Sequence, residues 1–386
     1  MSGYQQTIKS QNKYQVLQTI IDHAPLSRTT VAKQLGLTKG TVSSLAAELI
    51  NEEIIIEYGP GTSSGGRRPV MLLFNEKAGY SIGIDVGVNY ILGILTDLKG
   101  EIVAKQKQTI HAYDFNKMFP NIVKTIQKLI DDSPASPYGV VGIGVGVPGI
   151  INHKGTILFA PNLEWENIDL KEKLQKTFNV PVTIENEANA GAYGEKVSNS
   201  FTPPLVNNIT YISAAIGIGV GLIINGEVYR GEEGFSGEFG HMMIDIDGRE
   251  CSCGSKGCWE MYASEKAILL EAERLLDIDS KLTLEFLIKE AEKNSKVEEL
   301  FERIGYYLGC GISNIVNSFN PQKVVIGNRL ALAEHLLKDS VWKAISHHTL
   351  NFHKEKLEVT FSSLTPYSTS IGAAHFMNEK FLTKIQ

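Results

Sequence analysis

The sequence has few cysteines, few aromatic residues and no long apolar run. Only 4 of its 386 residues are Cys, and three of these lie between positions 251 and 258, which excludes the dispersed disulfide framework of a small secreted protein. The start of the chain has no apolar segment typical of a signal peptide. The longest apolar run, residues 140–151, is interrupted by Gly and Pro and is too short to span a membrane. These absences predict a cytoplasmic protein.

The chain also lacks the net positive charge of a protein that binds nucleic acid over most of its surface. Its formal charge is -6, but the charge is unevenly distributed. Residues 1–75 hold 7 basic and 5 acidic side chains, whereas the rest of the chain holds 30 and 38. Residues 27–47 and 59–75 contain basic side chains and no acidic one. This asymmetry predicts a local contact with a polyanion near the N-terminus.

Residues 1–75 have the pattern of a winged helix-turn-helix domain. Apolar residues recur at helical spacing from about residue 16. Ser27 is a typical N-cap for a helix over 28–35 that Gly36 would end, and Thr38 is a typical N-cap for the next helix. Strand-like segments at 54–58 and 70–74 then enclose a loop rich in Gly and Ser, which would form the wing.

The composition of the second helix of this motif favours DNA binding. The first residues of that helix reach base edges in the major groove, and here they are short hydrogen-bonding side chains and one cation. A wing ending in Gly-Gly-Arg-Arg would approach the backbone or the minor groove. The alternative is a small helical bundle that serves as an interaction module. The predicted DNA-binding residues are Arg28, Thr38, Lys39, Thr41, Ser43, Ser44, Arg67 and Arg68.

Residues 76–386 predict an α/β body of two similar lobes. Three short strands over 80–109 are followed by a helix and a buried strand at 140–147. A second strand pair at 209–224, with Asn225-Gly226 as a hairpin turn, is followed by a long helix over 296–319 and a strand at 323–326. Two such runs of strands and helices predict two lobes with a ligand cleft between them.

One cluster of residues has the composition of a metal site. His241 precedes Cys251, Cys253 and Cys258 in the pattern H-x9-C-x-C-x4-C. Three thiolates and one imidazole fill a tetrahedral zinc shell and leave no position for water, so the pattern predicts a structural Zn²⁺. The alternatives are reduced free thiols, or a disulfide with one Cys left over.

Several short islands carry the amides and carboxylates that recognise sugar hydroxyls. If His241 binds zinc through one ring nitrogen, its other nitrogen is available to a ligand. Taken singly, each of these residues is better explained as a surface-loop residue or a helix cap. The residues are Asn162, Asn186, Glu187, Glu238, His241 and Glu260.

With these motifs the chain resembles the ROK family of repressors and sugar kinases, and within it the repressors of xylose operons. The resemblance rests on GIDVGVN (83–89), PNLEW (161–165), ENEANAGAYGE (185–195), GFSGEFGH (234–241) and CSCGSKGCWE (251–260). It implies an actin/hexokinase-like (ribonuclease H-like) sugar-binding body behind the winged helix. It also implies zinc on His241 and the three clustered Cys residues, and a sugar on the six polar residues named above.

The sequence departs from the family's kinases at their phosphate-handling positions. The kinase resemblance places an Asp base at position 187, where this chain has Glu, one methylene longer. Val88 and Asn89 replace a Gly and a Thr of the first phosphate loop, and Ile216 and Val220 replace a Thr and a Gly of the second. Residues 327–329 read Gly-Asn-Arg where the kinases have a GGG-type turn. These changes predict a body that binds sugar without phosphoryl transfer.

The resulting prediction is a homodimeric repressor of sugar-utilisation genes that xylose releases from its operator. The family's Asp addresses the hydroxyl on C6, which a pentose lacks, and the longer Glu187 would fill that space. Three alternatives remain at this point: an active ATP-dependent kinase with a DNA-binding head, a repressor controlled by another sugar, and a repressor controlled by a protein partner.

Overall fold

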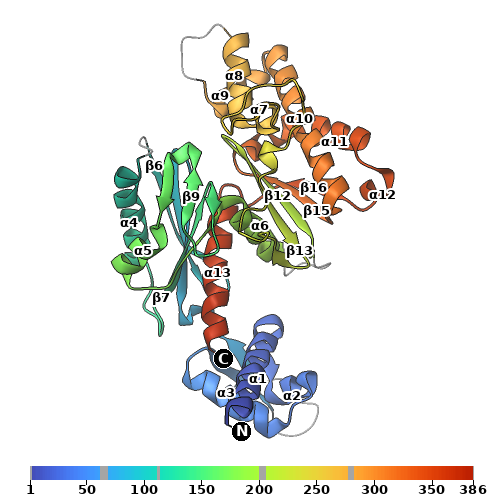
Figure 1. Cartoon of the computed structure of the whole chain (residues 1–386). Coiled ribbons are helices and arrows are strands. Elements are labelled where there is room, and N and C mark those ends of the chain that lie inside the picture. Colours follow the sequence, from blue (N-terminus) through green and yellow to red (C-terminus); the bar gives the residue numbers. More distant parts are fainter. Residues whose placement is uncertain (1, 61–67, 111–113, 200–205, 277–281, 386) are drawn as a thin grey trace.

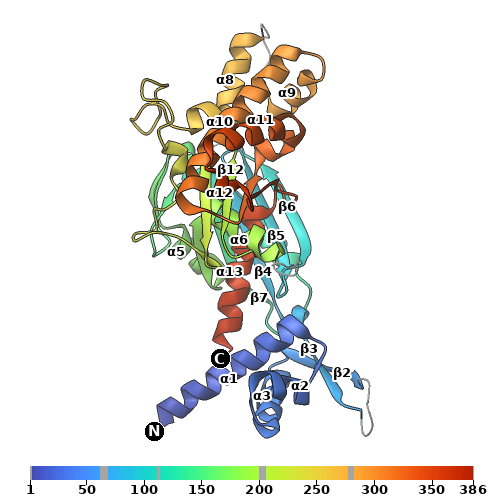
Figure 2. The same cartoon turned by 90° about the vertical axis from the view of Figure 1, so that its right-hand side faces the viewer.

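The computed structural model describes residues 2–60, 68–110, 114–199, 206–276 and 282–385 (Figure 1). An N-terminal helical domain lies at one end, and two sheet-containing lobes lie beyond it. Both chain ends lie at or near the N-terminal domain (Figures 1 and 2). In the described ranges, none of the helices combines the length and apolar content that a membrane span needs.

The N-terminal domain has the helices and strands of a winged helix-turn-helix. Its three-stranded sheet has the order β1-β3-β2, and one apolar cluster around Val16, Ile20, Leu45 and Leu72 holds the helices against this sheet. Residues 61–67, which the sequence predicts to belong to the wing, lie outside the described residues. The elements are α1 (Ser2–His23), β1 (Leu26–Ser27), α2 (Arg28–Leu35), α3 (Lys39–Asn51), β2 (Ile55–Pro60) and β3 (Val70–Phe74).

The caps predicted for α2 and α3 are confirmed. The Ser27 hydroxyl accepts a hydrogen bond from the Thr30 backbone N–H at 3.1 Å, and the Thr38 hydroxyl accepts one from the Thr41 backbone N–H at 3.1 Å. Gly36 ends α2 in the left-handed region, with φ of 66°. These caps fix the turn that presents the start of α3 to solvent.

The first lobe is built on a five-stranded sheet of order β11-β7-β4-β5-β6. Alternate residues of β4, such as Ile82 and Ile84, pack with α4 and α5 in one apolar cluster. A small antiparallel sheet, β10-β9-β8, joins this lobe, and it was not predicted from the sequence. The elements are η1 (Glu76–Ala78), β4 (Tyr80–Val86), β5 (Tyr90–Asp97), β6 (Ile102–Thr109), α4 (Phe115–Asp131), β7 (Val140–Val147), β8 (Ile150–Ile151), β9 (Ile157–Ala160), η2 (Pro161–Leu163), β10 (Trp165–Ile168), α5 (Leu170–Phe178) and β11 (Val182–Asn186).

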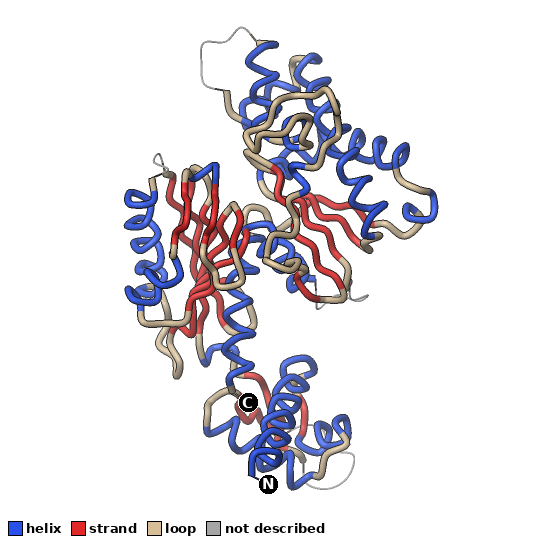
Figure 3. The backbone as a smooth tube through the Cα atoms, in the orientation of Figure 1, coloured by secondary structure: helices blue, strands red, loops and turns tan. Residues whose placement is uncertain are grey.

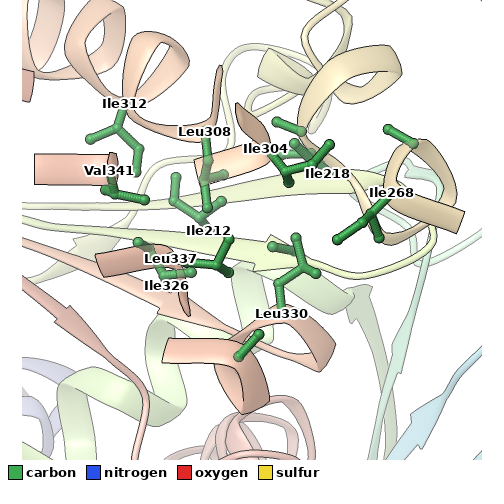
Figure 4. Close-up of a cluster of buried hydrophobic side chains, with 14 of the residues drawn as sticks. Ile212, Ile218, Ile268, Ile304, Leu308, Ile312, Ile326, Leu330, Leu337 and Val341 are labelled. Atoms are coloured by element: carbon green, nitrogen blue, oxygen red, sulfur yellow. The ribbon is translucent and has the colours of Figure 1, made fainter. Parts of the chain in front are cut away.

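The second lobe has a five-stranded sheet of order β14-β13-β12-β15-β16. Apolar residues of β12, β13 and β15, among them Ile212 and Ile326, pack against α10 and α11 in the largest core of the molecule (Figure 4). The elements after β11 are α6 (Glu187–Asn199), β12 (Ile209–Ala214), β13 (Ile218–Ile224), β14 (Glu227–Val228), η3 (Phe239–His241), α7 (Glu260–Ala263), α8 (Glu265–Leu275), α9 (Leu284–Ala291), α10 (Ser295–Phe319), β15 (Lys323–Gly327), η4 (Arg329–Ala333), α11 (Glu334–His348), α12 (Asn351–Lys354) and β16 (Glu358–Phe361), followed by α13 (Ser368–Lys384), which returns to the first lobe.

The two lobes share one topology, which confirms the predicted duplication. In each sheet three consecutive strands form an antiparallel meander, and two later strands add in parallel beside its first strand. Asn225 and Gly226, with φ of 53° and 82°, turn β13 into β14 as predicted. Because the sheets match, equivalent ends of their strands face the same central space.

Helices α6 and α13 lie between the two sheets (Figures 1 and 3). Close approach of α13 to the first sheet depends on glycine. A Cβ atom at Gly83 would lie 1.9 Å from the Ser370 carbonyl oxygen, and one at Gly144 would lie 1.9 Å from the Ala373 carbonyl oxygen. From this buried position α13 runs to the N-terminal domain, where Leu382 joins the apolar cluster of the winged helix.

Candidate functional site

A cavity of about 350 Å³ is lined by residues of both lobes. This volume lies within the range of small-molecule sites. All six residues predicted to bind a sugar line this cavity, although they come from separate parts of the chain. They are Asn162 of η2, Asn186 at the end of β11, Glu187 at the start of α6, Glu238 before η3, His241 at the end of η3 and Glu260 at the start of α7.

Two glycines around the start of β13 make room for the carboxylates of this cavity. A Cβ atom at Gly219 would lie 2.9 Å from Oε1 of Glu187. A Cβ atom at Gly217 would lie 2.9 Å from Oε2 of Glu260 and 3.8 Å from Nδ2 of Asn162. A larger residue at either position would therefore displace a polar side chain from the cavity.

The cavity concentrates carboxyl groups away from water. Burial, together with the nearby charges of Asp85 and Glu238, raises the pKa of Glu187 to about 8. Burial also raises the pKa of Asp85 to about 7, against the opposing effect of a hydrogen bond from Tyr90. Carboxyl groups that retain protons near neutral pH can both donate to and accept from hydroxyl groups.

Asn186 has a structural role in addition to its place in the cavity. Its Oδ1 atom accepts hydrogen bonds from the backbone N–H groups of Ala188 at 2.8 Å and Asn189 at 3.2 Å, which caps α6. Its Nδ2 atom donates to the Gly149 carbonyl at 3.0 Å. These bonds leave one N–H of the amide for a ligand. Asn186 therefore holds the loops around Glu187 in place.

The predicted metal ligands lie together. The donor atoms of His241, Cys251, Cys253 and Cys258 all lie within 4.8 Å of one another. The Cys251 sulfur lies 3.6 Å from His241 Nδ1, and the sulfurs of Cys253 and Cys258 are 3.6 Å apart. Sulfur ligands about 2.3 Å from a tetrahedral Zn²⁺ are separated by about 3.8 Å. The cluster can therefore hold a metal ion.

This cluster directly adjoins the cavity. Oε1 of Glu260 lies 3.6 Å from His241 Nδ1 and accepts a hydrogen bond from the Cys251 thiol at 3.4 Å. His241 and Glu260 also line the cavity. The Nδ1 atom of His241 faces the sulfur ligands, so Nε2 is its remaining polar atom.

Beside β4, side chains that line the cavity form hydrogen bonds with one another. The Tyr90 hydroxyl donates to Oδ2 of Asp85 at 2.8 Å, and its ring lies where a Cβ atom at Gly87 would be, 2.4 Å from the nearest ring carbon. Val88, Asn89 and Ile216 line the cavity close by. Val220 also lines the cavity, and its side chain is 2% exposed and packs in the core of the second lobe.

Arg329, at the far side of the cavity, is held by two carboxylates. Its guanidinium donates to both carboxylate oxygens of Glu265, at 3.0 and 3.1 Å, and to both of Glu285, at 2.6 and 3.1 Å. The preceding residue, Asn328, has φ of 62° and donates to the Ser213 hydroxyl at 3.1 Å. The guanidinium is thus engaged by two carboxylates of the protein.

The predicted DNA-binding residues occupy two kinds of position. Thr38, Lys39, Ser43, Ser44 and Arg68 are exposed, and Thr41 is half-buried. Arg28 donates to Glu57 of β2 at 2.6 Å, so it joins α2 to the wing strand as well as facing solvent. Arg67 lies outside the described residues.

Asp85 and Tyr90 were not selected from the sequence as a functional pair. Asp85 is 3% exposed near the end of an otherwise apolar strand. A charged residue near the end of a buried strand is unusual, and this could have marked Asp85 as a functional residue in the sequence. Tyr90 offered no such signal, because a tyrosine at the start of a strand is common.

The chain is similar to known sugar regulators over nearly its whole length. The sequence profile described as ROK family matches residues 81–380. The xylose repressor of Bacillus subtilis is 44% identical over 379 residues, which cover 98% of this chain and 97% of that protein. The crystal structure of a ROK family transcriptional regulator, a homologue of the E. coli MLC protein, matches with a TM-score of 0.81, 25% identity and 98% of each chain covered.

The body alone is similar to an enzyme. A ROK family glucokinase from Streptomyces griseus, solved with glucose and AMPPNP, matches with a TM-score of 0.70 and 26% identity. This match covers 77% of the present chain and 99% of the glucokinase. The shared part of the fold is therefore one on which both sugar and nucleotide binding occur.

Proposed function

This chain belongs to the ROK family, and we propose that it is a repressor of xylose-utilisation genes whose inducer is D-xylose. A sugar-responsive, DNA-binding repressor is the function that its full-length relatives support. The observation that carries the proposal is that six polar residues from four separate segments line one cavity in a chain that also exposes the start of α3. We place its action in the cytoplasm, on operator DNA.

The sugar occupies the cavity between the lobes. The carboxyl groups of Glu187, Glu238 and Glu260 form hydrogen bonds with its hydroxyl groups, and Asn162 supplies an amide. His241 contributes Nε2 from the side opposite the metal-type cluster. A pentose suits this arrangement because the longer Glu187 side chain occupies the volume that a C6 hydroxymethyl group would need.

The four clustered donors fit a structural zinc ion. Three Cys and one His make up a closed shell without a position for substrate, and their mutual distances agree with such a shell. Zinc bound there would fix the loop that carries His241 and Glu260. Its role in this proposal is to hold the sugar-contacting side chains in place, and it takes part in no chemical step.

The protein acts without phosphorylating its sugar. Asp85 is engaged by the Tyr90 hydroxyl, Arg329 is engaged by Glu265 and Glu285, and Val88 and Ile216 line the cavity where the family's kinases have Gly and Thr. Incubation with ATP, Mg²⁺ and xylose or glucose is expected to yield no sugar phosphate. Turnover of either sugar would establish the alternative, an active kinase with a DNA-binding head.

DNA recognition uses the N-terminal domain as a dimer. The start of α3 would enter the major groove and contact base edges and phosphates through Thr38, Lys39, Thr41, Ser43 and Ser44. Arg28, Arg67 and Arg68 would contact the backbone or the minor groove. Two domains in a homodimer would read two half-sites. Sugar releases the operator only if it binds the operator-incompetent arrangement more tightly than the competent one.

A gel shift of the operator with a panel of pentoses and hexoses tests this function. Release by xylose, and by no hexose at the same concentration, is the expected result. Release by a different sugar would keep the repressor and change the inducer. Release by no sugar in the panel would favour control by a protein partner.

A further inference from the structure

We propose that Arg230 is a positioning residue which, through its ion pair with Glu185, clasps the two lobes together and sets the affinity for the sugar. Neither residue lines the cavity, and neither was predicted from the sequence to take part in the function. The inference rests on the proposed function, because its effect is measured on sugar binding and operator release.

Glu185 holds the first lobe's side of this clasp. It lies on β11 directly before Asn186 and Glu187, and its side chain is 12% exposed. Its Oε1 atom accepts from the Asn186 backbone N–H at 3.1 Å and from the Asn189 amide at 3.2 Å. Its Oε2 atom is left for a partner from outside this lobe.

Arg230 supplies that partner from the second lobe. It follows β14, and its Nε and Nη2 atoms lie 2.8 and 2.7 Å from Oε2 of Glu185. The guanidinium also lies over the ring of Phe376 in α13, 5.6 Å from the ring centroid. One side chain therefore contacts the sheet of the first lobe, the loop of the second lobe and the helix between them.

The segment that Arg230 anchors carries sugar-contacting residues. From Arg230 the chain runs through residues 231–237 to Glu238 and His241. A second contact across the lobes lies within the same segment, where the His153 ring is hydrogen-bonded to the Glu232 carbonyl. A Cβ atom at Gly234 would lie 2.8 Å from the Ile151 carbonyl oxygen, so the segment packs directly on the β8–β9 hairpin.

This arrangement makes Arg230 a determinant of preorganisation. Sugar binding requires Glu187 from one side and Glu238 with His241 from the other side to be at fixed separation. When the ion pair already holds this separation, sugar binding does not have to order the 231–237 segment, and less conformational entropy is lost on binding. Its loss therefore weakens sugar binding, and it leaves the DNA-reading face of α3 unchanged.

The test compares Arg230→Met with Arg230→Lys in the full-length protein. We expect Arg230→Met to raise the Kd for xylose about tenfold, measured by calorimetry, and to raise by the same factor the xylose concentration that half-releases the operator. Operator affinity without sugar should stay within about twofold of wild type. Arg230→Lys keeps the charge and should recover at least half of the lost binding free energy.

A double variant and a control separate the clasp from general stability. Arg230→Met/Glu185→Gln removes the pair without leaving a buried charge, and it should be no weaker in xylose binding than Arg230→Met alone. Arg303→Met breaks an ion pair with Glu271 that lies within the second lobe, and it should leave the Kd for xylose unchanged.

Two results would overturn the clasp. One is an Arg230→Met protein whose Kd for xylose stays within twofold of wild type. The other is loss of sugar binding together with operator binding, without recovery by lysine, which would indicate a role in folding only. A wild-type protein that binds no sugar would instead refute the proposed function, and the clasp with it.

Discussion

The Thr369 hydroxyl, near the start of α13, donates a hydrogen bond to the backbone carbonyl of Glu187 at 3.1 Å. Further along α13, the Glu379 carboxylate accepts a hydrogen bond from the Tyr193 hydroxyl of α6. Near its end, Leu382 and Phe381 pack with the apolar cluster of the winged helix, and the Phe381 ring meets that of Tyr138 of the first lobe edge-on, with 4.9 Å between the centroids. One helix therefore joins the cavity to the base of the DNA-reading domain (Figure 2).

This connection predicts the effect of Phe381→Ala. The substitution removes a ring that packs between α13 and the N-terminal domain, and it leaves the cavity untouched. We expect the ratio of operator Kd with and without sugar to fall at least about fivefold, within the usual range of coupling energies. Operator titrations with and without saturating sugar measure this ratio. An unchanged ratio would exclude α13 as the connection.

Glu187→Asp is expected to alter the choice between sugars. Shortening the side chain by one methylene opens volume near the position of a C6 hydroxymethyl group. The ratio of glucose affinity to xylose affinity should therefore increase, by about tenfold if one hydrogen bond is exchanged. Calorimetric titration with both sugars measures it. Equal ratios in the two proteins would remove the explanation given for a pentose inducer.

The sugar-free protein should lose stability as the pH rises. The pKa of Glu187 is raised from 4.5 to about 8, and that of Asp85 to about 7. Between the unfolded and folded values, the unfolded chain releases protons that the folded chain keeps, so the free energy of unfolding falls with rising pH and levels off above about pH 8. Thermal denaturation from about pH 6 to pH 9 should show a falling Tm, with a smaller decrease in Glu187→Gln. Parallel curves for the two proteins would contradict the assignment.

Removal of the metal should damage sugar sensing before DNA binding. The four ligands adjoin Glu260 and lie in the second lobe, whereas α3 belongs to a separate apolar cluster. In chelated protein, or in Cys253→Ser, we expect operator affinity to stay within about threefold while xylose no longer releases the DNA. Undiminished release of the operator by sugar in metal-free protein would show that the cluster has no part in sensing.

Lys39→Ala should weaken operator binding through the phosphate backbone. The side chain is exposed at the first position of α3. Loss of one phosphate contact should reduce the slope of log affinity against log salt by about 1. A matched change at Lys33, which is exposed on α2, serves as the control. A salt slope identical to that of wild type would place Lys39 outside the interface.

Much of the fold was predictable because local signals and tertiary packing agree. Ser27, Gly36 and Thr38 end or begin helices as their side chains and backbone freedom predict. The first two strands of the meander over 80–109 are largely apolar and buried along their length. The small sheet of β8, β9 and β10 was missed, since its strands of two to four residues are too short for a periodic signal.

The polar residues that line the cavity could be predicted from the sequence, whereas the ion pair between the lobes could not. Glu187, His241 and Glu260 stand in motifs with a family resemblance, whereas Arg230 and Glu185 meet only after the two lobes have folded. For Val220, the sequence reveals the size of the side chain but not the direction in which it points. The alternation of β13 directs that side chain into the core and turns Gly219 toward Glu187.

The central claim, that a sugar in the inter-lobe cavity controls an operator-binding head, is tested most directly by reciprocal titration. Xylose affinity is measured with and without saturating operator, and operator affinity with and without saturating xylose. Linkage requires the two ratios to be equal and greater than 1, and we expect a common factor of about 5 to 150. Ratios of 1 in both directions would contradict the account.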